Sequence, residues 1–225
     1  MENPLPSLLK RAFALLASLL SLSAQTFAFE SPLTDHSIRE AYFLGQHHDA
    51  STESALKPYL HKLSPPEKGP YIADIRILTP YAQVLEASNS HGAGYSAQQA
   101  AADYHAHPDL IVVRFQIRFT PTYSYIKSNR NRGANSPPGA ITVRSEDFWQ
   151  SFKAGLSQND RWIEPISHEG EPIYIADAEG GSTLDGAYIW LTFDANEISS
   201  DTVTAEIFTP DNQHVTSDFD LATLR

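Results

Sequence analysis

The chain has 225 residues, 41% hydrophobic and 11% aromatic, which is enough apolar material for a folded core and excludes disorder over its whole length. With 27 acidic and 16 basic residues, its formal net charge is -11, which opposes binding to a polyanion such as nucleic acid. It has no cysteine, so disulfides and lipid attachment at an N-terminal cysteine are excluded. We therefore predict a soluble protein that is stabilised by core burial alone.

The N-terminal residues have the pattern of a secretory signal peptide. Lys10 and Arg11 precede an apolar run at residues 12–22, which is too short to cross a bilayer and has the length of a signal-peptide core. Ala24 and Ala28 are both candidate cleavage sites, and the small residue at position 26 favours cleavage after Ala28. We predict a signal peptide at residues 1–28 and a periplasmic or secreted product without stable membrane insertion; the alternative is a retained membrane anchor.

A helical pattern follows. Ile38, Ala41, Leu56 and Leu60 belong to two sets of apolar residues at three- and four-residue spacing, which predicts two short helices between residues 37 and 63. Prolines and a glycine at residues 64–70 are expected to end the second helix. We predict an N-terminal helical segment at residues 29–69, followed by one domain at residues 70–225.

Strand patterns dominate residues 70–225. Apolar and polar residues alternate at 110–120, 187–193, 203–207 and 215–221, and the last two segments are expected to form a hairpin. Weaker strand signals lie at 141–143, 152–156 and 173–175; residues 75–86 are interpreted as a strand bent or divided at Pro80, and residues 96–104 as a helix. The predicted fold is mainly β: an immunoglobulin-like antiparallel β-sandwich with short N-terminal helices.

Two segments are candidates for binding a divalent metal. His105 and His107 occupy alternate positions, which on an extended chain directs two imidazoles the same way. Asp177, Glu179 and Asp185 lie in a glycine-containing stretch whose oxygen atoms suit a hard cation such as calcium. The alternative for both segments is an exposed polar loop. Two functional alternatives follow: a metal-dependent enzyme that uses His105 and His107, and a calcium-stabilised carbohydrate- or protein-binding domain.

Aromatic residues suggest a binding surface. Tyr188 and Trp190 fall on the polar face of a predicted strand, and Tyr123 and Tyr125 follow another strand, so these rings are candidates for stacking on sugars or peptides. The alternative is that the second sheet or the helices bury them. No nucleophile elbow or complete catalytic set is present, so we predict a binding or structural module of the cell envelope, with an envelope protein or a glycan as partner, rather than an enzyme.

Three segments carry a resemblance to known proteins: SIREAYFLG at residues 37–45, GYSAQQ at 94–99 and DFDLATLR at 218–225. They resemble a family of uncharacterised exported bacterial proteins. The resemblance implies export and covers most of the chain after the signal peptide. It implies no activity, ligand or catalytic residue.

Overall fold

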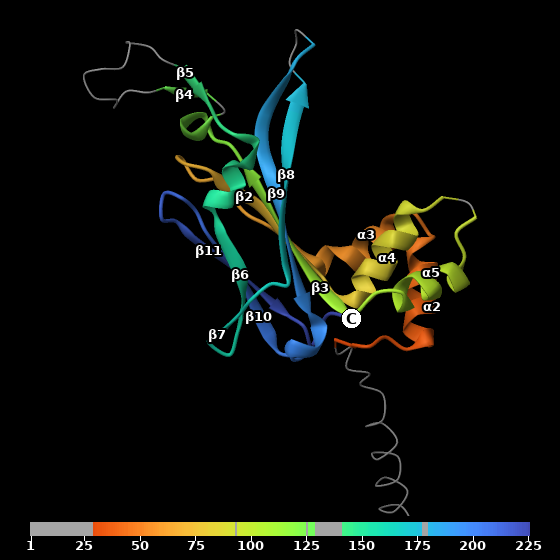
Figure 1. Ribbon diagram of the computed structural model, residues 1–225. Coiled ribbons are helices and arrows are strands. Elements are labelled where there is room, and N and C mark those ends of the chain that lie inside the picture. The colour runs from red at the N-terminus through yellow and green to blue at the C-terminus, as the bar shows by residue number, and fades with distance from the viewer. Residues whose placement is uncertain (1–28, 93, 125, 129–140, 177–179) are drawn as a thin grey trace, which may run out of the picture.

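The computed structural model describes residues 29–92, 94–124, 126–128, 141–176 and 180–225 (Figure 1). Two antiparallel sheets pack face to face, with strand orders β1-β2-β3-β9-β8 and β11-β10-β6-β7, and β4 and β5 form a separate ribbon. The strands of the five-stranded sheet are β1 (Leu60–Lys62), β2 (Tyr71–Leu78), β3 (Leu110–Arg118), β8 (Ser167–Ala176) and β9 (Ser182–Asp194). The remaining strands are β4 (Ile126–Ser128), β5 (Ile141–Val143), β6 (Lys153–Gln158), β7 (Arg161–Ile163), β10 (Thr202–Phe208) and β11 (His214–Asp220).

Alternation along β3 explains why its sheet has one buried and one outward face. Every second residue from Ile111 to Ile117 is fully buried, while Arg114 and Gln116 between them are only partly buried. The two antiparallel sheets confirm the predicted β-sandwich. The immunoglobulin-like arrangement stays a prediction.

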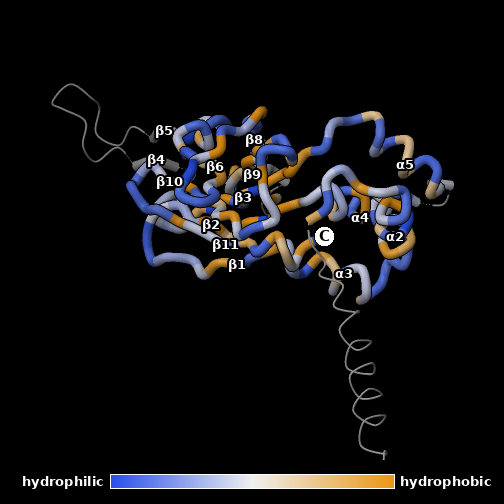
Figure 2. The backbone as a smooth tube through the Cα atoms, turned by 90° about the horizontal axis from the view of Figure 1, so that it is seen from below, coloured by the Kyte–Doolittle hydropathy of each residue, from blue (hydrophilic) through white to orange (hydrophobic). Residues whose placement is uncertain are grey.

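Apolar side chains from both sheets meet in one core. Phe115 and Ile189 come from the five-stranded sheet, and Leu156 and Phe219 from the four-stranded sheet, and all four are essentially inaccessible to solvent. In Figure 2 the orange, hydrophobic stretches run within the strands of the sandwich, whereas the connections between them are mostly blue. Burial of this area is the main stabilising contribution in a chain without disulfides.

A helical unit lies beside one end of the sandwich (Figure 1). It contains α2 (Asp35–Gly45), α3 (Ala50–Leu56), α4 (Pro80–Ser90) and α5 (Ala97–His105). Short 3-10 turns among the described residues are η1 (Lys57–Tyr59), η2 (Pro121–Tyr123), η3 (Glu146–Ser151) and η4 (Ala195–Glu197). The helical unit's own apolar cluster includes Ile38, Tyr81, Leu85 and Ala100. The helical part of the fold thus draws on residues both before and after residue 70.

The predictions for two segments, residues 81–86 and residues 60–62, are wrong. Residues 81–86 belong to helix α4 rather than to a strand, because Thr79 caps the helix through Ala82 N–H and Pro80 occupies its first turn. Residues 60–62 form β1 rather than the end of a helix, because Leu60 pairs with Arg76 of β2 and this tertiary pairing overrides the local pattern.

Arg225, the last residue of the sequence, links the helical unit to the sandwich. Its Nη1 lies 2.5 Å from Glu40 Oε1 on α2, and its guanidinium carbon lies 4.6 Å from the ring centroid of Tyr81 on α4. Its backbone N–H donates to the hydroxyl of Tyr59 at 3.1 Å. Within the described ranges, no helix has the length and apolar character needed to cross a bilayer.

Candidate functional site

The outward face of the five-stranded sheet carries two neighbouring rows of polar and aromatic side chains. The strand register places Arg114 beside Trp190, and Trp190 beside Glu169 of the edge strand β8. One row along, it places Gln116 beside Tyr188, and Tyr188 beside Glu171. We call this surface the aromatic-arginine face; its residues are Asp74, Arg76, Arg114, Gln116, Glu169, Glu171, Tyr188 and Trp190.

Arg114 organises the centre of the face. Its Nη2 lies 3.0 Å from Asp74 Oδ1, and the two side chains are only 18% and 13% exposed. Its guanidinium carbon lies 4.8 Å from the ring centroid of Tyr188 and 5.7 Å from that of Trp190, which are cation–π distances. Arg114 is therefore held in one position by a carboxylate and two aromatic rings.

A hollow of about 350 Å³ opens beside Trp190. Its other walls include Ser167, Thr192, Glu169 and Glu171. Neither glutamate side chain makes a hydrogen bond or an ion pair with any residue that the structure describes. The hollow thus combines an indole ring with two hydroxyls and two unpaired carboxylates.

Ion pairs lie at two edges of the aromatic-arginine face. Glu86 of α4 pairs with Arg76; burial raises the pKa of Glu86, and the nearby guanidinium groups of Arg76 and Arg114 partly oppose that rise. At the far end of β9, Asp185 pairs with Arg118. Between them, Gln116 Nε2 donates to the hydroxyl of Tyr188 at 3.3 Å.

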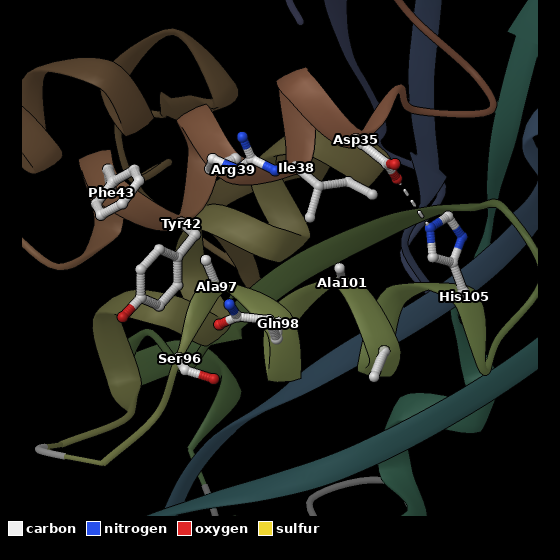
Figure 3. Close-up of a pocket in the computed structure, with 11 residues that line it drawn as sticks. Asp35, Ile38, Arg39, Tyr42, Phe43, Ser96, Ala97, Gln98, Ala101 and His105 are labelled. Atoms are coloured by element: carbon white, nitrogen blue, oxygen red, sulfur yellow. Dashed lines mark hydrogen bonds and ion pairs between the residues drawn. The ribbon is translucent and has the colours of Figure 1, made fainter.

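The two histidines proposed as metal ligands line different hollows. His105, at the end of α5, lies 3.5 Å from Asp35 Oδ1 and closes one end of a groove of about 540 Å³ between α2 and α5, in which Tyr42 and Ala101 also lie (Figure 3). His107 lines a second hollow, between α4 and α5. Within the part of the chain that the structure describes, no three histidine, aspartate or glutamate side chains are grouped so that they could hold a metal ion. The metal site with His105 and His107 stays a prediction.

The remaining candidate residues are dispersed. Asp177, Glu179 and Tyr125 lie outside the described residues, so the calcium hypothesis stays a prediction, and Asp185 is already paired with Arg118. Tyr123 packs on Phe119 with ring centroids 5.6 Å apart, and the guanidinium of Arg144 lies 3.3 Å from its ring centroid. Burial raises the pKa of the Tyr123 hydroxyl. Tyr123 is thus partly buried within its own cluster.

Sequence reasoning identified Tyr188 and Trp190 but missed their polar partners. Arg114 and Gln116 alternate with apolar residues along the predicted strand at 110–120, and this alternation indicates that they face outward. Glu169 and Glu171 show the same two-residue spacing on β8. What the sequence lacks is the register that sets these four residues beside the two rings.

No family model and no curated protein matches the chain. Among solved structures, one match is a chain described as "Structure of Iho670 Flagellar-like Filament", with 10% sequence identity, coverage of 94% of this chain and 98% of that chain, and a TM-score of 0.22. A TM-score this low shows neither a shared fold nor a shared function.

Proposed function

We propose that this protein is an exported binding module of the cell envelope that recognises a glycan on its aromatic-arginine face. The observation that carries the proposal is the position of Trp190 and Tyr188. Both rings lie on the outward side of β9, opposite the face that packs against the second sheet, and Arg114 contacts both. Their ring centroids are 6.2 Å apart and their planes are inclined by 51°, so they form two walls of a cradle rather than one flat platform.

The chemistry of the face matches that of a sugar. A pyranose has apolar C–H faces that pack on aromatic rings, and hydroxyls that pair with carboxylate, amide and guanidinium groups. Trp190 supplies the ring, and Glu169 and Thr192 supply polar atoms within the same hollow. Because Asp74 fixes Arg114, less conformational entropy is lost on binding than with a free side chain.

Charge narrows the class of glycan. Glu169 and Glu171 bring unpaired negative charge to the hollow, and the whole chain has a formal net charge of -11. A glycan rich in uronic acids or phosphate would be repelled. We therefore propose a neutral ligand with flat pyranose faces, as in β-1,4-linked oligosaccharides.

The test is calorimetric titration of the purified protein with cellohexaose and chitohexaose, with oligogalacturonate as the acidic comparison. We expect binding of at least one neutral oligosaccharide, a loss of affinity of about tenfold or more in Trp190→Ala, and little change in Trp162→Ala. Trp162 is the matched control because its ring lies on the other sheet, against Gly155. Failure of both neutral oligosaccharides to bind, or equal losses in the two variants, would overturn the proposal.

Export is supported by the predicted signal peptide at residues 1–28. Phe29, the residue after the proposed cleavage site, donates its backbone N–H to Leu221 O at 3.1 Å. We expect the protein recovered from its bacterial host to begin at Phe29 and to occur in the periplasm or the medium. Intact-mass measurement checks this, and a retained residue 1–28 segment in the mature protein would contradict it.

A further inference from the structure

A hollow of about 270 Å³ lies between α4, α5 and the start of β3, apart from the aromatic-arginine face. Its apolar wall includes Val84, Ala87, Ala100 and Leu110, of which Val84 and Ala100 are buried. An apolar cavity of about 150 Å³ accepts benzene. The hollow therefore has room for one aromatic ring with a short side chain.

A side-chain amide at its rim is locked in one orientation. Gln83 Nε2 donates to two backbone carbonyls, Leu78 O at 3.0 Å and Leu110 O at 2.6 Å. Both amide hydrogens are thereby used, which fixes the nitrogen and oxygen positions of the amide. Gln83 Oε1 makes no hydrogen bond to any residue described, so it is available as an acceptor.

A carboxylate lies on the other helix. Asp103 Oδ2 accepts a hydrogen bond from the Tyr95 hydroxyl at 2.9 Å, and Oδ1 has no partner among the described residues. The hollow thus offers an amide oxygen and an anionic oxygen, and the only titratable donor lining it beyond the tyrosines is His107. Acceptors with negative charge favour a cationic ligand that carries several donor hydrogens.

The aromatic walls of this hollow are already held in place. Tyr95 stacks on His91 with ring centroids 4.1 Å apart, and its carbonyl accepts from the Tyr42 hydroxyl at 2.8 Å. Burial and the neighbouring Asp103 raise the pKa of Tyr95 to about 12, so its hydroxyl stays neutral and keeps donating to the carboxylate. Tyr104 is held as well, by its hydrogen bonds to Asp109 and to the backbone N–H of Leu33. A pocket with fixed walls loses little entropy when a ligand enters.

We propose that the hollow between α4 and α5 is a second binding site, for a small molecule that joins an apolar ring to a protonated primary amine. The ring packs between Val84, Ala100 and Tyr104, and the ammonium donates to Asp103 Oδ1 and Gln83 Oε1. This site is independent of the glycan proposal, since none of its residues belongs to the aromatic-arginine face.

The test uses two probes with the same ring and opposite charge. Phenylethylamine and phenylacetate are titrated into the purified protein and followed by two-dimensional amide NMR. We expect phenylethylamine to shift resonances of α4 and α5, and phenylacetate to bind about tenfold or more weakly. Butylamine, which lacks the ring, is expected to bind more weakly than phenylethylamine.

Two variants localise the binding. Asp103→Asn keeps an acceptor for the Tyr95 hydroxyl and removes the charge, so we expect about a tenfold loss of phenylethylamine affinity. The matched control is Asp160→Asn, in the turn between β6 and β7, which should leave that affinity unchanged. Ala87→Leu fills the hollow from α4 and should abolish binding without changing the circular dichroism spectrum. If phenylethylamine does not bind, if phenylacetate binds equally well, or if Asp103→Asn and Asp160→Asn have the same affinity, the proposal is overturned.

Discussion

The outward faces of the two sheets each carry a tryptophan, yet the two rings have different surroundings. On the four-stranded sheet, Trp162 lies against Gly155 so closely that a Cβ there would be 2.1 Å from the ring, and Lys153 Nζ lies 5.4 Å from the ring centroid. On the five-stranded sheet, Trp190 borders an open hollow. An outward aromatic ring is therefore a candidate binding surface only where the protein does not already cover it.

The polar residues of the two faces differ as well. On the four-stranded sheet each pair has one exposed partner: His214, 46% exposed, pairs with Glu206 at 2.8 Å, and the exposed Asp218 accepts from the Thr204 hydroxyl at 2.7 Å. On the five-stranded sheet, the pair of Arg114 and Asp74 is mostly buried. Exposed pairs contribute little to stability, whereas a mostly buried pair is costly to break. The comparison predicts that equivalent substitutions have unequal effects on the two faces.

The largest difference is expected between two glycine substitutions. In Gly186→Ala the new Cβ would lie 2.0 Å from the backbone oxygen of Ile117, so β9 and β3 must move apart, and we expect a loss of about 1–3 kcal/mol in the free energy of unfolding. In Gly155→Ala the obstacle is the ring of Trp162, which can turn outward, so the loss should be smaller. Urea unfolding of both variants checks this, and an equal or larger loss in Gly155→Ala would contradict the comparison.

A smaller difference is expected between two charge substitutions. Asp74→Asn keeps an oxygen acceptor for Arg114 but removes the negative charge beside a mostly buried guanidinium, and we expect a loss of about 1 kcal/mol in the free energy of unfolding. Asp218→Asn, on the exposed face of β11, should change stability by no more than about 0.5 kcal/mol. Thermal unfolding under identical conditions measures both, and a neutral Asp74→Asn would show that Arg114 is not held as described.

The smallest effect concerns pH. Burial lowers the pKa of His168, on the edge strand β8, below its ordinary value of 6.5. The unfolded chain therefore binds a proton at this residue more readily than the folded protein does. As the pH falls from above 6.5 toward the lowered pKa of the folded state, His168 reduces the free energy of unfolding. His168→Phe keeps the edge-on contact with Trp149, whose ring centroid is 5.3 Å away, and should flatten the stability profile between neutral and about pH 5. If the free energy of unfolding of His168→Phe depends on pH as steeply as that of the unsubstituted protein, His168 does not contribute to the loss of stability at low pH.

Local sequence patterns predict a helix or strand correctly where one face of the element is buried and the other is exposed to solvent. Strands β3, β9, β10 and β11 show that alternation, and helix α5 has a capping box in which Ser96 and Gln99 bond each other's backbone. Three-residue strands such as β1 and β7 are too short to show a period. Helix α4 was mistaken for a strand because apolar residues precede and follow Pro80 without a clear change of spacing.

The site was harder to predict than the fold. Alternation along β9 placed Tyr188 and Trp190 outward, but the neighbourhood of Trp190 depends on register between β3, β9 and β8, which no local pattern supplies. The spacing of His105 and His107 implies parallel side chains only on an extended chain. His105 is instead the last residue of α5, where successive residues turn around the helix axis.

The three tryptophans of the chain permit a direct test of the central claim, because each reports on a different place: Trp190 on the aromatic-arginine face, Trp162 on the opposite sheet and Trp149 in η3 beside β8. The measurement is a titration of the protein with the neutral oligosaccharide that binds it, following the three indole N–H resonances by NMR. We expect the Trp190 resonance to shift, with those of Trp162 and Trp149 nearly unchanged. A shift of Trp162 with Trp190 unchanged, or three unchanged resonances at saturation, would contradict the account.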